Sequence, residues 1–226
     1  MNEVSIRPIA HLRCDLPEKF GIPRQAGIVE ALEGLVVFEP EYREPEALRG
    51  LEGFSHIWLI WQFSRAVREG WSPTVRPPRL GGNARMGVFA TRSPFRPNAL
   101  GLSCVRLLGI EQTADEGPVL RVAGADLMDG TPIFDVKPYL PYADSHPEAS
   151  GGFAPDSGDT LQVNYAPGAL DQIPEGKREA LTGVLANDPR PRYQADPERV
   201  YGLSFAGKQV KFQVDGDELT VIKVEE

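Results

Sequence analysis

Few residues of this chain could form a disulfide framework or bind a metal ion. Its 226 residues include two cysteines and three histidines, namely Cys14, Cys104, His11, His56 and His146. Their spacing matches no zinc or cluster motif, so we expect no metal site. Long apolar runs are also missing. The longest, Phe54–Phe63, is about half of what a membrane-spanning helix needs, and the N-terminus resembles no targeting segment. We therefore expect a cytoplasmic protein without membrane contact.

The common nucleotide-binding motifs are absent as well. No predicted strand is followed by G-x-G-x-x-G opening a helix, and the P-loop sequence G-x-x-x-x-G-K-[ST] does not occur. A nucleotide-like cofactor would therefore bind outside a Rossmann or P-loop cradle. The net charge of −8 and pI near 5.1 disfavour RNA binding through overall charge. An RNA ligand would need a local basic patch.

One segment reverses this acidic balance. Residues 65–98 contain seven arginines, no lysine and one acidic residue, Glu69, which makes the segment +6 and leaves −14 for the rest. Guanidinium groups bind carboxylates and phosphates through two parallel hydrogen bonds. A solvated Arg/Pro-rich linker is the alternative, but apolar residues recur between the arginines and are expected to be buried. The arginines are Arg65, Arg68, Arg76, Arg79, Arg85, Arg92 and Arg96, and the apolar residues are Val88, Phe89, Phe95 and Leu100.

Strands dominate the predicted structure of the first 140 residues. We expect strands over 5–12, 35–38, 102–110 and 119–124, an acidic turn at 115–117 and a short helix at 45–50. The aromatic run 54–63 predicts a central strand covered on both faces. Little sequence remains for crossover helices. An antiparallel or barrel-like sheet therefore fits better than a doubly wound one.

A Gly-, Pro-, Ser- and Asp-rich stretch separates a second, smaller unit. The sequence after it predicts a strand over 161–166, a helix over 174–187 and a hairpin of 208–214 with 219–224. We therefore expect a mainly β (α+β overall) chain with a first domain at 1–145, a linker at 146–159 and an α+β C-terminal domain at 160–226.

Three further segments contain candidate functional residues, each with a plainer interpretation. The loop 19–27 could be a simple connector. Asp126, Asp129 and Asp135 surround an Asp-Gly turn that needs no ligand. The segment 188–193 has two arginines and a tyrosine that could hold phosphates and stack a base, although pairing of its arginines with Asp188 and Asp196 is the alternative. Histidine 56 fits a hydrogen-bonded structural role better than a catalytic one.

The run Gly87–Asn98, GVFATRSPFRPN, resembles the signature of the TrmO family of tRNA methyltransferases, also called TsaA-like or YaeB-like proteins. Other segments resemble the family in the same order. They are 19–25, 50–56, 71–82, 126–141 and 188–193, so the likeness spans roughly residues 4–215. It implies a single-sheet, non-Rossmann β-barrel that binds S-adenosylmethionine and methylates N6 of N6-threonylcarbamoyladenosine beside the anticodon of threonine tRNAs. It also implies a homodimer with the cofactor near the subunit interface.

The resemblance also assigns residues. It places at the methyl donor Pro23, Arg24, Gln25, Ser64, Arg65, Arg92, Leu100, Asp126, Leu127, Met128 and Asp129. Our interpretation of the arginines gives the tRNA the residues Arg76, Arg79, Arg96, Arg190, Arg192 and Tyr193. Arg92 and Arg96 would hold carboxylate groups of donor or substrate, and Arg76, Arg79, Arg190 and Arg192 would meet the RNA backbone. Ser64-Arg65 departs from the family, whose members have a histidine and a polar residue there.

The general base stays unassigned, with Asp129, Asp135 and His56 as candidates on residue type only. Two other classes of function compete with the methyltransferase. A non-catalytic RNA-binding or S-adenosylmethionine-sensing module could use the same arginines. A hydrolase or phosphatase built on Asp126, Asp129 and Asp135 would need a divalent metal.

Overall fold

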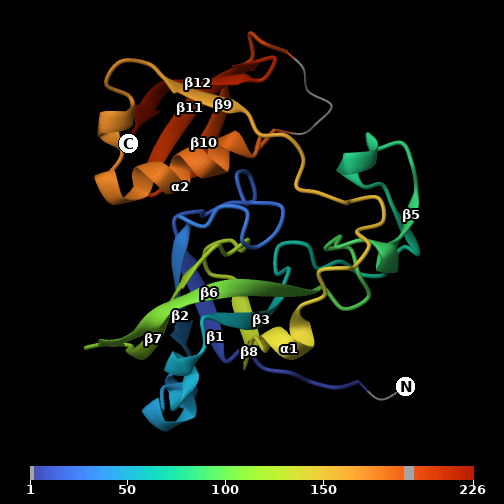
Figure 1. Cartoon of the computed structure of the whole chain (residues 1–226), viewed down its shortest axis with the longest axis vertical. Coiled ribbons are helices and arrows are strands. Elements are labelled where there is room, and N and C mark those ends of the chain that lie inside the picture. The colour runs from blue at the N-terminus through green and yellow to red at the C-terminus, as the bar shows by residue number, and fades with distance from the viewer. Residues whose placement is uncertain (1–2, 191–195) are drawn as a thin grey trace.

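In the computed structural model, which describes residues 3–190 and 196–226, the chain folds into two units joined by an extended segment (Figure 1). The first contains six antiparallel strands that hydrogen-bond in a closed ring, in the order β1-β2-β7-β6-β3-β8. They are β1 (Ala10–Cys14), β2 (Glu33–Phe38), β3 (His56–Gln62), β6 (Leu100–Thr113), β7 (Gly117–Ala123) and β8 (Pro132–Pro138). The expected mainly β, antiparallel architecture is confirmed.

The core of this ring is formed by alternate residues of its strands. Leu12, Val36, Leu59 and Leu120 are each fully buried and belong to one hydrophobic cluster. Strand β3 shows the alternation clearly, because its inner residues are buried and its outer residues are half-exposed. The prediction that this strand is covered on both faces is therefore wrong. Its outer aromatic and aliphatic side chains remain available to line a binding site.

Short elements connect the ring strands. Single turns of 3-10 helix lie at η1 (Pro40–Tyr42), η2 (Pro45–Leu48) and η3 (Leu51–Gly53), which confirms the short helix expected near residue 45. The first strand begins five residues later than predicted, at Ala10, and the residues from 3 to 8 are exposed. Strand β8 was not predicted because turn residues precede it and Asp135 interrupts its apolar pattern.

The arginine-rich segment forms an arm beside the ring (Figure 1). It contains β4 (Thr74–Val75), η4 (Pro78–Leu80), β5 (Met86–Gly87) and η5 (Val88–Ala90), with β4 and β5 paired antiparallel. Val88 is buried and anchors the arm, whereas Phe89 is 72% exposed and Leu100 is 36% exposed. The expectation that both residues are buried is therefore wrong. Proline and glycine prevent a regular period here, so burial could not be inferred from spacing.

The C-terminal unit is a four-stranded sheet with one helix against it (Figure 1). After α1 (Pro141–Asp144) and the linker come β9 (Gln162–Tyr165), η6 (Leu170–Gln172), α2 (Glu175–Ala186), β10 (Tyr201–Phe205), β11 (Lys208–Asp215) and β12 (Glu218–Glu225). The sheet order is β10-β11-β12-β9, and only β9 pairs in parallel. The expected strand, helix and hairpin are confirmed, and β10 was missed.

The two units share a hydrophobic core. Leu16, Val29 and Leu32, which lie between β1 and β2, belong to the same buried cluster as α2 and the C-terminal sheet. The contact is reinforced by an ion pair of 2.5 Å between Lys177 Nζ and Asp15 Oδ2. The loop 19–27 is therefore held between the ring and the C-terminal unit.

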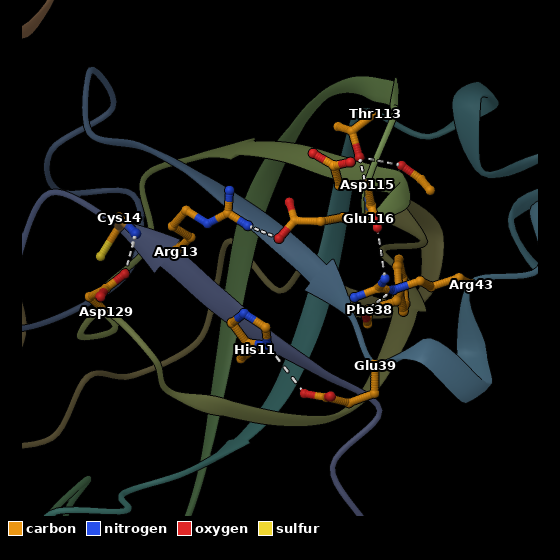
Figure 2. A network of polar contacts seen from close by, with 11 residues as sticks. His11, Arg13, Cys14, Phe38, Glu39, Arg43, Thr113, Asp115, Glu116 and Asp129 are labelled. Atoms are coloured by element: carbon orange, nitrogen blue, oxygen red, sulfur yellow. Dashed lines mark hydrogen bonds and ion pairs between the residues drawn. The ribbon is translucent and has the colours of Figure 1, made fainter.

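A polar network surrounds β1 and the turn between β6 and β7 (Figure 2). Arg13 pairs with Glu116 of the β6–β7 turn, and Arg43 donates to the carbonyls of Phe38 and Asp115. The Cys14 thiol points toward the Leu127 carbonyl, and burial raises its pKa to about 11. This thiol therefore stays protonated near neutral pH and is a poor nucleophile.

Candidate donor pocket and basic groove

A pocket of about 610 Å³ opens where β3 and β6 meet the loops around residues 19–25, 63–66 and 91–96. Its volume and its mixture of aromatic, aliphatic and a few charged side chains suit a small organic ligand. Nine of the eleven residues expected at a methyl donor line it: Pro23, Arg24, Gln25, Ser64, Arg65, Arg92, Leu100, Asp126 and Met128. Segments more than 60 residues apart in the chain thus meet at one site.

The floor of the pocket depends on a close contact between β3 and β6. A Cβ atom on Gly101 would lie 2.3 Å from Cε2 of Trp61, so only glycine lets the indole lie across β6. The same indole meets Phe63 edge-on, with ring centroids 4.3 Å apart. Its Nε1–H donates to Ser103 Oγ at 2.9 Å. Trp61 is therefore fixed from three sides.

Gly101→Ala is expected to displace Trp61 and to lower the free energy of unfolding by about 1–3 kcal/mol, as overpacking of a buried site does. Donor affinity should fall with it, because Trp61 and Gly101 both line the pocket. Gly109→Ala in the same strand is the control, since nothing lies within 4 Å of a Cβ there. Urea unfolding of both variants checks this, and equal losses would contradict it.

Asp126 is the one carboxylate among the residues that line this pocket. Ser103, itself 2% exposed, donates its hydroxyl to Asp126 Oδ1 at 2.5 Å. Burial raises the pKa of Asp126, while the Ser103 hydrogen bond and the charge of Arg92 oppose the rise. The residue is an acceptor in a chain of hydrogen bonds that runs from Trp61 through Ser103. Sequence reasoning missed Ser103, whose spacing from position 126 carries no motif.

Cations border the same pocket. Arg92 is exposed and donates to the side-chain oxygen of Gln25, which joins the signature segment to the 19–27 loop. Arg96 donates from Nη1 to the Thr91 carbonyl at 2.7 Å and also lines the pocket. Arg24 donates to the Asp188 carbonyl at 3.4 Å. An anionic group in the pocket would therefore meet guanidinium groups, and a cationic group would meet the Asp126 carboxylate.

The two remaining residues expected at the donor and the three candidate bases do not line this pocket. Leu127 is buried in the ring core, and the carboxylate of Asp129 accepts from the Cys14 N–H at 2.9 Å (Figure 2). Asp135 pairs with Lys137 at 2.9 Å, and His56 contacts Ser55 Oγ at 3.0 Å. The three candidate bases are thus absent from its lining. Within residues 3–190 and 196–226, no group of three or more His, Cys, Asp or Glu side chains could hold a metal ion.

A wider groove of about 1720 Å³ continues from the pocket along the arm, the linker and the end of α2. The four tRNA candidates in the described residues line it, namely Arg76, Arg79, Arg96 and Arg190, whereas Arg192 and Tyr193 lie outside the described residues. Arg79 binds Asp156 and fixes the linker to the arm. Arg190 pairs with Asp188 through Nε at 2.8 Å, which is the alternative pairing considered for this segment.

Comparison with known proteins agrees with this arrangement. The model of the tRNA-methyltransferase O N-terminal domain matches residues 11–145, and the TrmO C-terminal domain model matches 159–226. The tRNA (adenine(37)-N6)-methyltransferase of Escherichia coli K12 is 41% identical over 223 residues, covering 95% of this chain and 94% of the relative. RcsF of Pseudomonas aeruginosa, named for S-adenosylmethionine-dependent methyl transfer, is 43% identical over 207 residues, covering 88% of this chain and 87% of the relative.

A solved structure extends the likeness to the fold. The crystal structure of TrmO from Pseudomonas aeruginosa superposes with a TM-score of 0.82 at 34% identity, covering 100% of this chain and 99% of that one. The likeness therefore includes both units and the segment between them. Family models, relatives and structure agree, and the chain belongs to the tRNA-methyltransferase O (TrmO) family.

Proposed function

We propose that this chain is an S-adenosylmethionine-dependent tRNA methyltransferase that methylates N6 of N6-threonylcarbamoyladenosine next to the anticodon of threonine tRNAs. The observation that carries the proposal is the meeting of the donor loop, the arginine signature and Asp126 in one pocket that opens into a basic groove. A small cofactor and a large polyanion would thus bind side by side. The ring of six strands supports the expected single-sheet barrel as the donor-binding body.

The lining of the pocket fits S-adenosylmethionine by chemical type. Asp126 can accept hydrogen bonds from an ammonium or from ribose hydroxyls, and Arg92 can hold a carboxylate. Trp61, Phe63 and Met128 provide apolar surface for an aromatic base. Within the described part of the chain, no glycine-rich loop of the dinucleotide-binding type lines this pocket. The donor site is instead built from four loops and one strand pair.

When bound, S-adenosylmethionine supplies an electrophilic methyl group on a sulfonium. The residues of this chain contribute binding and orientation, because Asp126 and Arg92 both line the pocket. Arg92 and Arg96 line both the pocket and the groove, so they are placed to hold the carboxylate of the donor and the threonyl carboxylate of the acceptor. Holding the two reactants in line in this way can remove a large part of the activation barrier to methyl transfer.

The arginines of the groove divide by what they already bind. Arg76 is exposed and makes no hydrogen bond or ion pair within the described part of the chain, so it is the best placed for an RNA phosphate. Arg79 and Arg190 are committed to Asp156 and Asp188. We therefore propose that these two shape the groove, and that phosphate contacts fall to Arg76 and its exposed neighbour Arg85.

We also propose a homodimer in the cytoplasm. The outer face of β3 and β6, which lines the pocket, carries Leu102, which is 55% exposed, and Leu100, with Trp58 and Ile60 half-buried around them. A second subunit on this face would bury these side chains and shield the donor pocket from water. None of the helices in the described part of the chain is long and apolar enough to cross a membrane.

Two measurements separate this function from its main alternative. The enzyme is expected to bind labelled S-adenosylmethionine in equilibrium dialysis and to transfer the label to threonine tRNA without added metal. Binding without any transfer would favour the non-catalytic sensor. Transfer that is abolished by a chelator would contradict the donor site described above.

The pH dependence of donor binding tests Asp126. Burial raises the pKa of Asp126 above the usual value for aspartate. As the pH falls through this raised pKa, the carboxylate becomes protonated, and donor affinity is expected to fall with it. The Ser103 hydrogen bond lowers this pKa, so Ser103→Ala should move the loss to higher pH. Equilibrium dialysis between pH 7 and 4.5 measures the midpoint. Ser72→Ala, which alters a bond within the arm, should leave the midpoint unchanged, and an equal shift would contradict the assignment.

A further inference from the structure

Two large aromatic side chains lie exposed in the middle of the basic groove. Trp71 is 53% exposed and Phe89 is 72% exposed, and both line the groove. Their ring centroids are 6.0 Å apart, with planes inclined by 30°. Exposed aromatic pairs of this size are costly to leave in water and are typical of surfaces that bind a partner. Nothing assigned so far to the donor or to phosphates uses them.

The pair is held in place by the arm. Phe89 follows Val88, whose side chain is buried and whose N–H donates to the Pro73 carbonyl at 2.9 Å. The guanidinium carbon of Arg96 lies 6.0 Å from the Phe89 ring centroid, and Arg96 is itself bound to the Thr91 carbonyl. Phe89 is therefore held in place before a ligand binds, and its contact with the Trp71 ring extends this surface, which reduces the entropy lost on binding.

A second aromatic contact lies beside this pair. The guanidinium carbon of Arg68 lies 3.9 Å from the Phe95 ring centroid, at cation–π distance. Both residues also line the groove. Guanidinium groups and aromatic rings thus line the same groove, which shares residues with the donor pocket. Such a combination is typical of sites for single-stranded RNA, whose unpaired bases stack on aromatic and guanidinium planes.

The charge around the aromatic pair identifies the kind of ligand. Nine cationic side chains line the groove against three acidic ones. The cations are Lys19, Arg24, Arg68, Arg76, Arg79, Arg85, Arg92, Arg96 and Arg190, and the acids are Glu69, Asp156 and Asp188. A second copy of this chain would bring the same arginines and meet like charge. An RNA loop brings phosphates together with the flat faces of its bases.

We propose that Trp71 and Phe89 form a stacking platform for an unpaired base next to the adenosine that is methylated. The proposal rests on the proposed function, because it assumes that the acceptor is an RNA loop. Arg92, Arg96, Thr91 and Pro94 line both the groove and the donor pocket, so a base on the platform has its neighbour close to the donor. The platform thus holds the loop open and sets the register of the target nucleotide.

The test uses the anticodon stem–loop of threonine tRNA with 2-aminopurine at single loop positions, added to the full-length protein. Stacking on Trp71 should quench the fluorescence of the probe at one position beside the target. Trp71→Ala and Phe89→Ala should each weaken binding about 5- to 100-fold, the usual effect of losing one base stack, and Trp71→Phe should keep most of the affinity. The dissociation constant for S-adenosylmethionine should not change.

Two control variants separate stacking from other effects. Tyr142→Ala removes an 87% exposed aromatic outside both the pocket and the groove and should bind RNA like the wild type. Arg76→Ala should reduce the salt slope of binding by about 0.7–0.9, as loss of one phosphate contact does, whereas the aromatic variants should keep the slope.

Two results would overturn the stacking platform and a third would overturn the proposed function, and the measurements distinguish the three. Unchanged RNA affinity in Trp71→Ala and Phe89→Ala, with an active wild type, would overturn the platform alone. Weaker RNA binding that appears only together with subunit dissociation in sedimentation would show that a second copy of the chain covers these rings. A wild type that binds the stem–loop but methylates no tRNA would overturn the proposed function.

Discussion

Asp126→Asn is expected to raise the dissociation constant for S-adenosylmethionine about 10- to 100-fold. A carboxylate that accepts hydrogen bonds from a charged or polar ligand contributes about 1.5–3 kcal/mol, and asparagine keeps the shape but loses the charge. The variant should remain folded, because burial already disfavours the ionised form of this residue and the amide carries no charge to bury. Equilibrium dialysis measures the affinity, and thermal unfolding measures the stability.

The matched control for this change is Asp115→Asn in the turn between β6 and β7 (Figure 2). Asp115→Asn removes one negative charge, as Asp126→Asn does, and Asp115 is absent from the lining of both the pocket and the groove. Its donor affinity should equal that of the wild type. A similar loss in both variants would mean that net charge, rather than the Asp126 carboxylate, governs binding, and the donor site would have to be placed elsewhere.

Gly21→Ala is expected to lower the free energy of unfolding by about 2–5 kcal/mol and to weaken donor and RNA binding together. Gly21 has φ of +97°, where a Cβ costs about 1–2 kcal/mol, and that Cβ would lie 2.2 Å from Cδ1 of the fully buried Leu203. Overpacking adds about 1–3 kcal/mol. Since residues 22–25 line the pocket and the groove, a displaced loop should affect both ligands. Urea unfolding and the two binding assays measure these losses.

Gly27→Ala in the same loop separates the two causes. Gly27 has φ of +79°, but nothing lies within 4 Å of its added Cβ, so only the backbone term of about 1–2 kcal/mol is expected. The difference between the variants then measures the contact between the donor loop and the C-terminal sheet. Equal effects would contradict the view that the C-terminal unit supports the donor site.

Much of this architecture could be predicted because it depends on local patterns. The apolar run of β2, the alternating apolar residues of β11 and β12 and the helical spacing of Leu181, Val184 and Leu185 lead to the observed elements. The proposed donor pocket was expected from a resemblance of short motifs, whose residues 23–25 and 92 line one pocket. Residue types alone could not show that Asp126, and not Asp129, lines the pocket.

The remainder depends on contacts between distant segments. The hydrogen bond from Ser103 to Asp126 joins β6 to a loop that follows β7, and the shared core joins Leu16 and Val29 to a helix about 150 residues away. Neither follows from periodicity. The exposure of Phe89 was missed for a related reason, because an aromatic residue beside buried Val88 is expected in a core unless the turn of η5 points it outward.

The most direct test of the central claim is nucleoside analysis of threonine tRNA after incubation with the enzyme and labelled S-adenosylmethionine. Two substrates are compared, one carrying threonylcarbamoyladenosine and one with plain adenosine at the same position. The account predicts that label appears only in the first tRNA, as N6-methylated threonylcarbamoyladenosine. Label in plain adenosine, or in neither tRNA although both are bound, would contradict it.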